Sequence, residues 1–444
     1  MKISYLILFG GFLVGISSIN AQEKTNLKLE EAINLAWTKS NEVALANTKV
    51  ETKKQELQAT KNNQYPDLKL TGEYLRLTEA SIDLQFNAGS GTLPIPDQLL
   101  IGQATLKLPI YSGMKIQNGI KLQDNLYQAE NALASQTKEA IAMRVINYYS
   151  NLYKSQRTVE LLKENLKTAQ QRVIDFTALE KNGIIPRNDL LKSQLQVSKV
   201  QLSLDEAIHN ATIVNYHLVT LLKLPTDTKI ELQENDLVHF KMDNIATNEQ
   251  PAFENRKDLA AIQYQEKATQ NNINMAKGDY YPSIAVVGGY AALNLNNIVT
   301  LENAMYLGVG LSYDISGIYK NGTQVKIAES KALEVKNSEE LLKDHIRIQV
   351  QQAITNYDLA IKQDIVYNQA VVQAIENYRI VKDKYENGLS DTNDLLEADV
   401  EQLKSKISET IAKVDVIQKY YELLSATGQL TKTFNLPIAI GTKI

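Results

Sequence analysis

Two acidic residues three positions apart are the strongest candidates for chemistry in this sequence. Asp394 and Glu397 lie in a stretch of good helix formers, so both side chains would project from one face of a helix. Carboxylates gathered around a passage favour cations and resist anions. Acidic side chains also suit the first turn of a helix, where the helix dipole is positive, so a plain solvated turn explains the same pair.

The sequence contains no comparable group of residues for covalent catalysis. The chain has no cysteine, which excludes disulfides, thiol catalysis and cysteine-ligated metals. Its four histidines are scattered, and no H-E-x-x-H motif accompanies His209 and His217. We therefore expect neither an enzyme nor a cofactor or metal site. With 47 basic and 51 acidic residues, the chain also lacks the strongly basic footprint of a protein that binds nucleic acid.

The N-terminus has the layout of a secretory signal peptide. Lys2 precedes an apolar run over Ile3–Ile19, and Ala21 offers a small residue for cleavage. An uncleaved membrane anchor is the alternative, although the apolar run is short for a span. No later segment has about 18 consecutive apolar residues. An exported chain of this kind is either soluble or crosses a membrane as a β-barrel.

Long stretches without glycine or proline predict very long helices. The two longest, 120–182 and 323–387, would each extend for about 95 Å as helices. Shorter stretches follow at 187–224 and 389–427. Their apolar residues recur every seven positions, which favours a coiled coil, although amphipathic packing on an ordinary core uses the same spacing. The repeating residues are Leu190, Val197, Leu204, Ala211 and Leu218, then Leu396, Leu403, Ile417 and Leu424, with polar Thr410 at the remaining position of the second series.

The order of these features recurs, which indicates an internal tandem duplication. Asn182-Gly183 ends the first long helix and Asn387-Gly388 ends the second, and glycine supplies the tight turn at such a helix end. The two breaks would form the tips of two helical hairpins. We expect Asn188 and Asn393 to cap the helices that follow.

Four stretches of alternating apolar and polar residues predict β-strands. They form two hairpins, at about 65–112 and 281–316, each ahead of a long helix pair. Each run has about 10–12 residues, close to the length of a tilted transmembrane strand. Four strands cannot close a barrel, because the smallest transmembrane barrels have eight, so other copies of the chain would have to complete it. The alternative is a soluble hairpin packed on helices.

Short motifs in this order resemble the TolC-like outer membrane efflux proteins, also called outer membrane factors. The resemblance covers essentially the whole mature chain. It implies a mainly α fold with a β-barrel part, in which three chains give four strands each to one twelve-stranded barrel and their helices form a long coiled-coil tunnel. The matching segments are Leu27–Ala36, Tyr65-Pro66, Leu108–Gly113 and, most specifically, Tyr385–Gly388 through Asp394–Ala398.

The resemblance also assigns residues to the ends of the helical hairpins. Asp394 and Glu397 match acidic residues that constrict the tunnel, so a trimer would gather six carboxylates around one axis. Asp189 and Tyr385 match members of a hydrogen-bond network that holds the tips closed, although Ser390 stands where a basic residue would complete it. The tip residues would meet a periplasmic adaptor, unless they are plain turns: Asn182, Gly183, Ile184, Asn387, Gly388 and Leu389.

The implied function is that of a passive channel-tunnel in the outer membrane of a Gram-negative-type cell, with a large periplasmic part. As a homotrimer in outer membrane lipid, it would work with a periplasmic adaptor (a membrane fusion protein) and an inner membrane pump of the RND or ABC type. It would carry small molecules such as drugs and toxic compounds, or secreted polypeptides, to the exterior. A different class of function, an exported coiled-coil scaffold or adhesin that does not conduct, is the alternative.

The expected organisation follows the duplication. A signal peptide over 1–21 precedes a first repeat over 22–225, an equatorial connector over 226–251, a second repeat over 252–428 and a C-terminal tail over 429–444. The first repeat holds an N-terminal helix, its hairpin and a helix pair over 114–224 with the tip at 183–188. The second holds a helix, its hairpin and a helix pair over 318–427 with the tip at 388–393.

Overall fold

The computed structural model describes residues 24–78, 96–232, 248–296 and 298–434. The predicted signal peptide lies outside the described residues, as do residues 435–444 of the predicted tail. The same holds for most of the link between the first two predicted strands and for part of the predicted connector.

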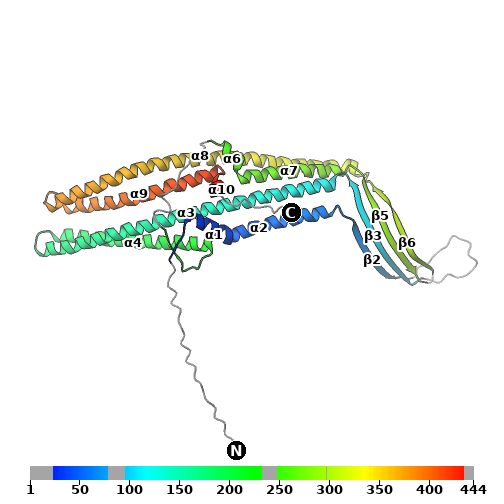
Figure 1. The fold of residues 1–444 in the computed structure, drawn as a ribbon, viewed down its shortest axis with the longest axis horizontal. Coiled ribbons are helices and arrows are strands. Elements are labelled where there is room, and N and C mark those ends of the chain that lie inside the picture. Colours follow the sequence, from blue (N-terminus) through cyan, green and yellow to red (C-terminus); the bar gives the residue numbers. More distant parts are fainter. Residues whose placement is uncertain (1–23, 79–95, 233–247, 297, 435–444) are drawn as a thin grey trace, which may run out of the picture. The chain divides into compact units, whose positions relative to one another are not determined.

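Four long helices make up much of the described chain (Figure 1). α3 (Lys115–Lys181) has 67 residues and α8 (Gly317–Glu386) has 70, so a straight helix of either length extends for about 100 Å. α4 (Arg187–Leu222) and α9 (Thr392–Ala426) follow them with 36 and 35 residues. Glycine enters only the first two turns of these helices and proline enters none of them, which permits such lengths.

The other helices are short. The first predicted helical stretch is divided at Ser40, whose backbone is extended with φ −66° and ψ 133°. Neither glycine nor proline marks this break, so the spacing of those residues does not predict it. The remaining helices are α1 (Leu29–Lys39), α2 (Asn41–Asn62), α6 (Gln250–Asn255), α7 (Lys257–Gly278) and α10 (Leu430–Thr433).

Four long strands form one antiparallel sheet in the order β2-β3-β5-β6, as Figure 1 shows. They are β2 (Asp67–Arg76), β3 (Gln98–Ser112), β5 (Ser283–Leu295) and β6 (Val299–Ser312). The central pair, β3 and β5, joins the two hairpins in antiparallel register. The outer strands β2 and β6 each have a neighbour on one side only within the described chain.

A second, small sheet holds the start of the described chain. β1 (Lys24–Asn26) pairs in parallel with β4 (Lys229–Glu231). The hydroxyl of Tyr149 on α3 donates a hydrogen bond of 2.9 Å to the carbonyl of Leu27, which ties this segment to a long helix.

The sequence of elements is the same in both halves of the chain. A helix, two strands, a helix of about 70 residues and a helix of about half that length occur in this order twice, as α2-β2-β3-α3-α4 and α7-β5-β6-α8-α9. The first set lies before residue 223 and the second after residue 256.

The chain divides by its internal packing into two compact units that do not follow this repetition. We call one the tip unit, which comprises described residues within 1–40, 144–242 and 359–418. The other is the sheet unit, which comprises described residues within 41–143, 243–358 and 419–444. The tip unit therefore contains both tip turns, and the sheet unit contains the four-stranded sheet.

The core of the tip unit is apolar and is shared by several helices. One cluster joins α3 and α4, with α9 packed against it, and uses the predicted seven-residue spacing: Leu162, Leu166, Val200, Leu204 and Ala207. A second cluster lies near the tip turns and consists of Phe176, Leu190 and Leu395, with partly buried Val173, Leu179, Ile185, Tyr378, Val381 and Tyr385 around it. Both halves of the chain thus contribute to one tip core.

In the sheet unit, the strands meet the helices through a close backbone contact. Gly113 follows β3 with φ +62°, and a Cβ atom placed on it would lie 2.2 Å from the carbonyl oxygen of Gly278. Beside this contact, Lys115 of α3 forms an ion pair of 2.7 Å with Asp279. A Cβ atom on Gly278 would in turn lie 2.6 Å from the carbonyl oxygen of Gly113, so only glycine fits at the end of α7 without a shift of the backbone. Among the described residues, no helix combines the length and the apolar character needed to cross a membrane.

Candidate functional site

The two tip turns have the same backbone geometry. Gly183 and Gly388 adopt the left-handed conformation, with φ +73° and +72°. In each turn the glycine N–H bonds back three residues and the next N–H, of Ile184 or Leu389, bonds back five residues. This pattern is the Schellman motif, which satisfies the last carbonyls of a helix. Both turns are exposed, and Ile184 and Leu389 are 67% and 77% accessible to solvent.

The helices that follow the tips begin differently from each other. α9 begins at Thr392, and the carboxylate of Asp391 accepts hydrogen bonds from the N–H groups of Asn393 and Asp394 at 2.7 and 3.0 Å. α4 has Pro186 as its capping residue, with no side-chain hydrogen bond. The expectation that Asn188 and Asn393 cap these helices is therefore wrong. A carboxylate at the N-cap accepts stronger, charge-assisted bonds than an amide does.

Both residues of the acidic pair point into solvent. Asp394 and Glu397 are exposed on the first turns of α9. The hydroxyl of Ser390 donates a hydrogen bond of 2.7 Å to the carboxylate of Asp394. Ser390 therefore binds an acid at the place where a basic residue would complete the network implied by the resemblance. Within the described residues of one chain, no basic side chain forms an ion pair with either acid.

Of the two other predicted tip residues, Asp189 has its partner on its own helix, whereas Tyr385 also contacts the other helical hairpin. Asp189 forms an ion pair with Lys192 at 3.5 Å, and its side chain is 19% exposed. The ring of Tyr385 is half-buried and stacks on Phe176, while its hydroxyl accepts a bond of 3.5 Å from Thr392. No hydrogen bond joins Asp189 to Tyr385 among the described residues of the chain.

A buried charged cluster lies on the other side of α9. Arg172 of α3 donates to the carboxylate of Asp399 at 2.9 Å and to the hydroxyl of Tyr378 on α8 at 3.2 Å. Asn165 of α3 donates to the second carboxylate oxygen at 3.2 Å. Burial lowers the pKa of Arg172, but the charge of Asp399 and the hydrogen bonds to Asp399 and Tyr378 outweigh it, so the pKa lies above its ordinary value.

One face of the four-stranded sheet is apolar across all its strands. Residues that pair directly across antiparallel strands point to the same face. The pairing places two apolar rows on this face next to the helices, and we call it the apolar face: Leu68, Leu106, Gly288 and Leu307, then Leu70, Ala104, Tyr290 and Met305. A further row, farther from the helices, is mixed and consists of Tyr74, Leu100, Asn294 and Thr300. The large side chains of this face are uncovered, since Leu70, Met305 and Leu307 are 78–80% exposed.

The opposite face carries the polar residues, and they gather on the first hairpin. We call this the polar face. In the three rows next to the helices, β2 and β3 carry charged, hydroxyl or amide side chains, whereas β5 and β6 carry mostly uncharged ones without such groups, apart from Tyr306. The rows are Asp67, Lys107, Val287 and Gly308; Lys69, Thr105, Gly289 and Tyr306; and Thr71, Gln103, Ala291 and Ala304. Next to the helices, the sheet therefore separates an apolar surface from a more polar one. The rows of the polar face that lie farther from the helices are mainly apolar, such as Leu75, Leu99, Leu295 and Val299.

Tyrosines mark the end of the sheet at which the strands meet the helices. Tyr65 precedes β2, Tyr111 lies at the end of β3, Tyr281 precedes β5 and Tyr313 follows β6. Because the strands are antiparallel, these four positions lie at the same end of the sheet, where the strands meet the helices. Tyr65, Tyr281 and Tyr313 are 66%, 58% and 44% exposed. Tyrosine is enriched where a membrane meets water, because its ring is apolar and its hydroxyl is polar.

Part of the second half of the chain is similar to a known protein family. Residues 250–429 match the family model described as outer membrane efflux protein. This match confirms the resemblance to the outer membrane efflux proteins. No curated protein sequence matches the chain.

Solved structures of outer membrane channels share the fold of this chain. The CmeC channel of Campylobacter jejuni has a TM-score of 0.78 and 14% identity, over 96% of this chain and 94% of that chain. VceC of Vibrio cholerae has a TM-score of 0.76 and 14% identity, over 90% and 96%. The open MtrE channel of Neisseria gonorrhoeae has a TM-score of 0.76 and 16% identity, over 91% and 89%. The expectation of a mainly helical chain with this fold is confirmed.

In this fold, the predicted site residues fall into one region of the tip unit. Tyr385 belongs to the tip core, and that core also contains Leu190 and Leu395, the neighbours of Asp189 and Asp394. Sequence reasoning missed Arg172 and Asp399. One sequence pattern could have pointed to Asp399, because it is a charged residue within the apolar face of a helix. It follows the buried residues Leu395 and Ala398 at the spacing of that face.

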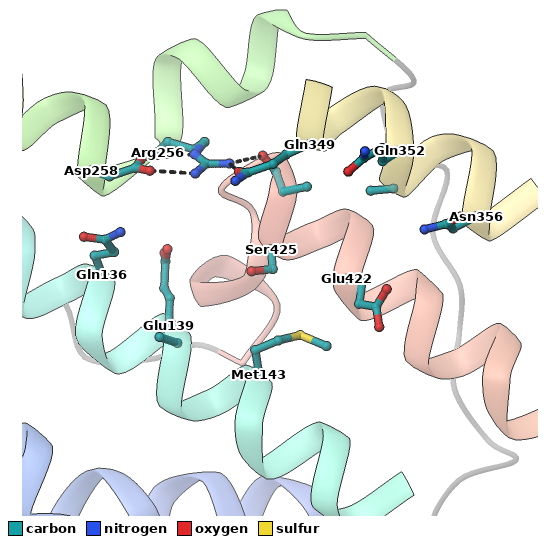
Figure 2. Close-up of a pocket in the computed structure, with 13 residues that line it drawn as sticks. Gln136, Glu139, Met143, Arg256, Asp258, Gln349, Gln352, Asn356, Glu422 and Ser425 are labelled. Atoms are coloured by element: carbon teal, nitrogen blue, oxygen red, sulfur yellow. Dashed lines mark hydrogen bonds and ion pairs between the residues drawn. The ribbon is translucent and has the colours of Figure 1, made fainter. Parts of the chain in front are cut away.

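The sheet unit contains a pocket of about 340 Å³ with both polar and apolar lining residues, which Figure 2 shows. Arg256 at the start of α7 donates to Asp258 at 2.6 Å, to Gln349 on α8 at 2.8 Å and to the carbonyl of Ala426 at 3.3 Å. The carbonyl belongs to the last residue of α9, where a cation is favourable for the helix dipole. The polar contacts beside this pocket therefore connect the start of α7 with α8 and with the end of α9. Among the described residues, no group of three or more histidines and acids could hold a metal.

Proposed function

We propose that three copies of this chain assemble into a channel of the outer membrane. The observation that carries the proposal is the uncovered apolar face of the sheet, which needs lipid or protein against it. Its polar opposite face suits a water-filled interior, since transmembrane barrel strands alternate apolar outward and polar inward residues. The tyrosines at the end of the sheet next to the helices support a membrane boundary at that end.

The two outer strands supply the reason for assembly. β2 and β6 leave one side unpaired within the described chain, and an unpaired edge inside lipid leaves backbone groups without partners. Pairing of β6 of one copy with β2 of the next satisfies both edges. Three copies give a closed sheet of twelve strands, within the size range of known transmembrane barrels.

The helical part would then form the periplasmic tunnel of a tripartite export system. The exposed aliphatic tips at Ile184 and Leu389 support contact with a periplasmic adaptor, because buried aliphatic side chains strengthen such an interface. An inner membrane pump of the RND or ABC type would supply the exported small molecules or polypeptides. In a trimer, Asp394 and Glu397 would gather six carboxylates around the axis and favour cations there.

Fractionation and conductance test this proposal together. The full-length protein should fractionate with the outer membrane and, after purification, conduct in planar lipid bilayers as a trimer. A chain that is released into the soluble fraction and gives no conductance would instead support the scaffold function. A channel that conducts but exports nothing when adaptor and pump are supplied would contradict only the tripartite role.

A further inference from the structure

Asp399 is a buried acid close to the exposed acidic pair on the same helix. Its side chain is only 3% exposed, and that of Arg172, its partner on α3, is 9% exposed. Asp394 precedes it by five residues and Glu397 by two. The three acids on the first turns of α9 thus have opposite environments: two lie in solvent and one lies in the protein.

The geometry of a helix relates these three positions to one another. Successive residues are rotated by about 100° around a helix axis. Asp394 and Glu397 are therefore turned from Asp399 by about 140° and about 160° in opposite senses. The exposed pair flanks the direction that points away from the buried acid. Any rotation of α9 that moved Asp399 would move the pair through the same angle.

The contacts of Asp399 resist such a rotation. Arg172 binds one carboxylate oxygen and Asn165 binds the other, and Arg172 also donates to Tyr378 on α8. Hydrogen bonds of a guanidinium are directional, because its donors lie in one plane. Loss of either charge would leave the other buried without a partner, which is strongly unfavourable. The cluster therefore fixes the rotation of α9 relative to α3 and α8 near its start.

We propose that Arg172 is a positioning residue for the acidic pair, which through Asp399 orients Asp394 and Glu397 toward the tunnel aperture. The inference rests on the proposed channel function and on the role of the pair in cation preference. A second ion pair between the same two helices, Lys154 with Asp415, lies further along α9 and serves as a control. Its side chains are more exposed, and it is sixteen residues beyond Asp399 in the chain.

Cysteine labelling tests the orientation directly, and it does not require a functioning channel. The chain has no cysteine, so a single introduced thiol is labelled alone. Glu397→Cys and Ala398→Cys replace an exposed and a buried neighbour on α9. With Arg172 present, a charged thiol reagent should label position 397 several-fold faster than position 398. Arg172→Met should shift this ratio toward equality, whereas Lys154→Met should leave it unchanged. An unchanged ratio in Arg172→Met trimers overturns the proposal.

Single-channel recording tests the consequence for cations. The magnesium concentration for half-block should rise several-fold in Arg172→Met, toward the value of the variant that lacks both acids, and should stay constant in Lys154→Met. The reciprocal exchange Arg172→Asp with Asp399→Arg should restore block if the pairing itself positions α9. If Arg172→Met does not assemble, the exchange variant decides: trimers with normal block support the proposal, and trimers with lost block, or no trimers, overturn it.

The two proposals fail in distinguishable ways. If Asp394→Ala with Glu397→Ala leaves magnesium block unchanged, the acidic pair is no cation filter, while the labelling ratio still tests the orientation. If that double variant loses block and Arg172→Met retains it, the filter stands and the positioning role of Arg172 is wrong.

Discussion

The ring of Tyr385 stacks on the ring of Phe176, with centroids 5.8 Å apart and an angle of 24° between the planes. Tyr385 is the last tyrosine of α8 and Phe176 lies near the end of α3, so this contact joins the two helical hairpins beside their tips. A residue assigned by resemblance to a hydrogen-bond network is thus held mainly by an apolar contact within its own chain. The first prediction separates the two contributions.

We expect Tyr385→Ala to lower the free energy of unfolding of the tip unit by about 2 kcal/mol, because it removes a half-buried ring and a stacked aromatic pair. Tyr385→Phe keeps the ring and loses only the 3.5 Å bond from Thr392, so its cost should be under about 0.5 kcal/mol. Denaturant unfolding of both variants measures the difference. Equal losses would show that the hydroxyl, and not the ring, holds the tips.

The acidic pair should determine cation block of the channel. Asp394→Ala with Glu397→Ala removes all six proposed carboxylates from a trimer, so block of single-channel current by divalent cations should weaken strongly. Glu401→Ala changes an exposed acid on the same helix and is the matched control, which should keep normal block. Recordings in planar bilayers at one fixed salt concentration make the comparison. Unchanged block in the double variant would contradict the filter assignment.

The turn at Gly388 should be required for export through an adaptor. Gly388→Trp places a bulky side chain on an exposed tip at φ +72°, where no other atom lies within 4 Å, so trimers should still form while adaptor-dependent export is lost. The left-handed backbone adds a strain of about 1–2 kcal/mol. Gly388→Asn is the control, because asparagine tolerates this conformation and is small. Export by Gly388→Trp at the rate of the natural chain would refute the contact.

The contact between Gly113 and Gly278 should not tolerate a methyl group. Gly278→Ala would bring a Cβ atom to 2.6 Å from the carbonyl oxygen of Gly113, so we expect a loss of about 1–3 kcal/mol from overpacking. Gly119→Ala is the matched control on α3, because its nearest neighbours are the side-chain atoms of Met275 at 3.6 Å. This change should be neutral or stabilising by up to about 1 kcal/mol through helix propensity. Thermal unfolding of the two variants provides the measurement.

A charged side chain should destabilise the protein in lipid much more on the apolar face of the sheet than on the polar face. Leu307→Lys places an ammonium group on the apolar face, where contact with lipid would cost about 2–4 kcal/mol near the middle of a bilayer. Gln103→Lys places the same group on the polar face and should cost much less. Folding into lipid vesicles, followed by titration with denaturant, compares the two variants. Equal costs would argue against lipid on the apolar face.

Much of this architecture follows from local sequence signals. The absence of glycine and proline predicts α3, α4, α8 and α9, since interruptions of long helices depend on those residues. The glycines at 183 and 388 predict the tip turns for the same local reason. Alternation predicts the strands, because a sheet with one apolar face needs a period of two.

Other features depend on contacts that local signals do not carry. The break at Ser40 has no helix-breaking residue, and the choice of Asp391 over Asn393 as the cap of α9 depends on where the turn ends. The pairing of Arg172 with Asp399 joins residues more than two hundred positions apart. A charged residue on an apolar stripe signals that a partner exists, but it does not say which one.

The central pair of the sheet constrains the order in which the chain can fold. Leu99 pairs with Leu295, and the whole of α3 and α4 lies between them in the chain. Contacts between residues so distant in sequence form slowly, because a long loop must close first, whereas helices form from local contacts within microseconds. We expect α3 and α4 to form their helical hairpin before β3 pairs with β5. Until then the strands of the first hairpin present open edges, so the partly folded chain would benefit from a chaperone that covers them.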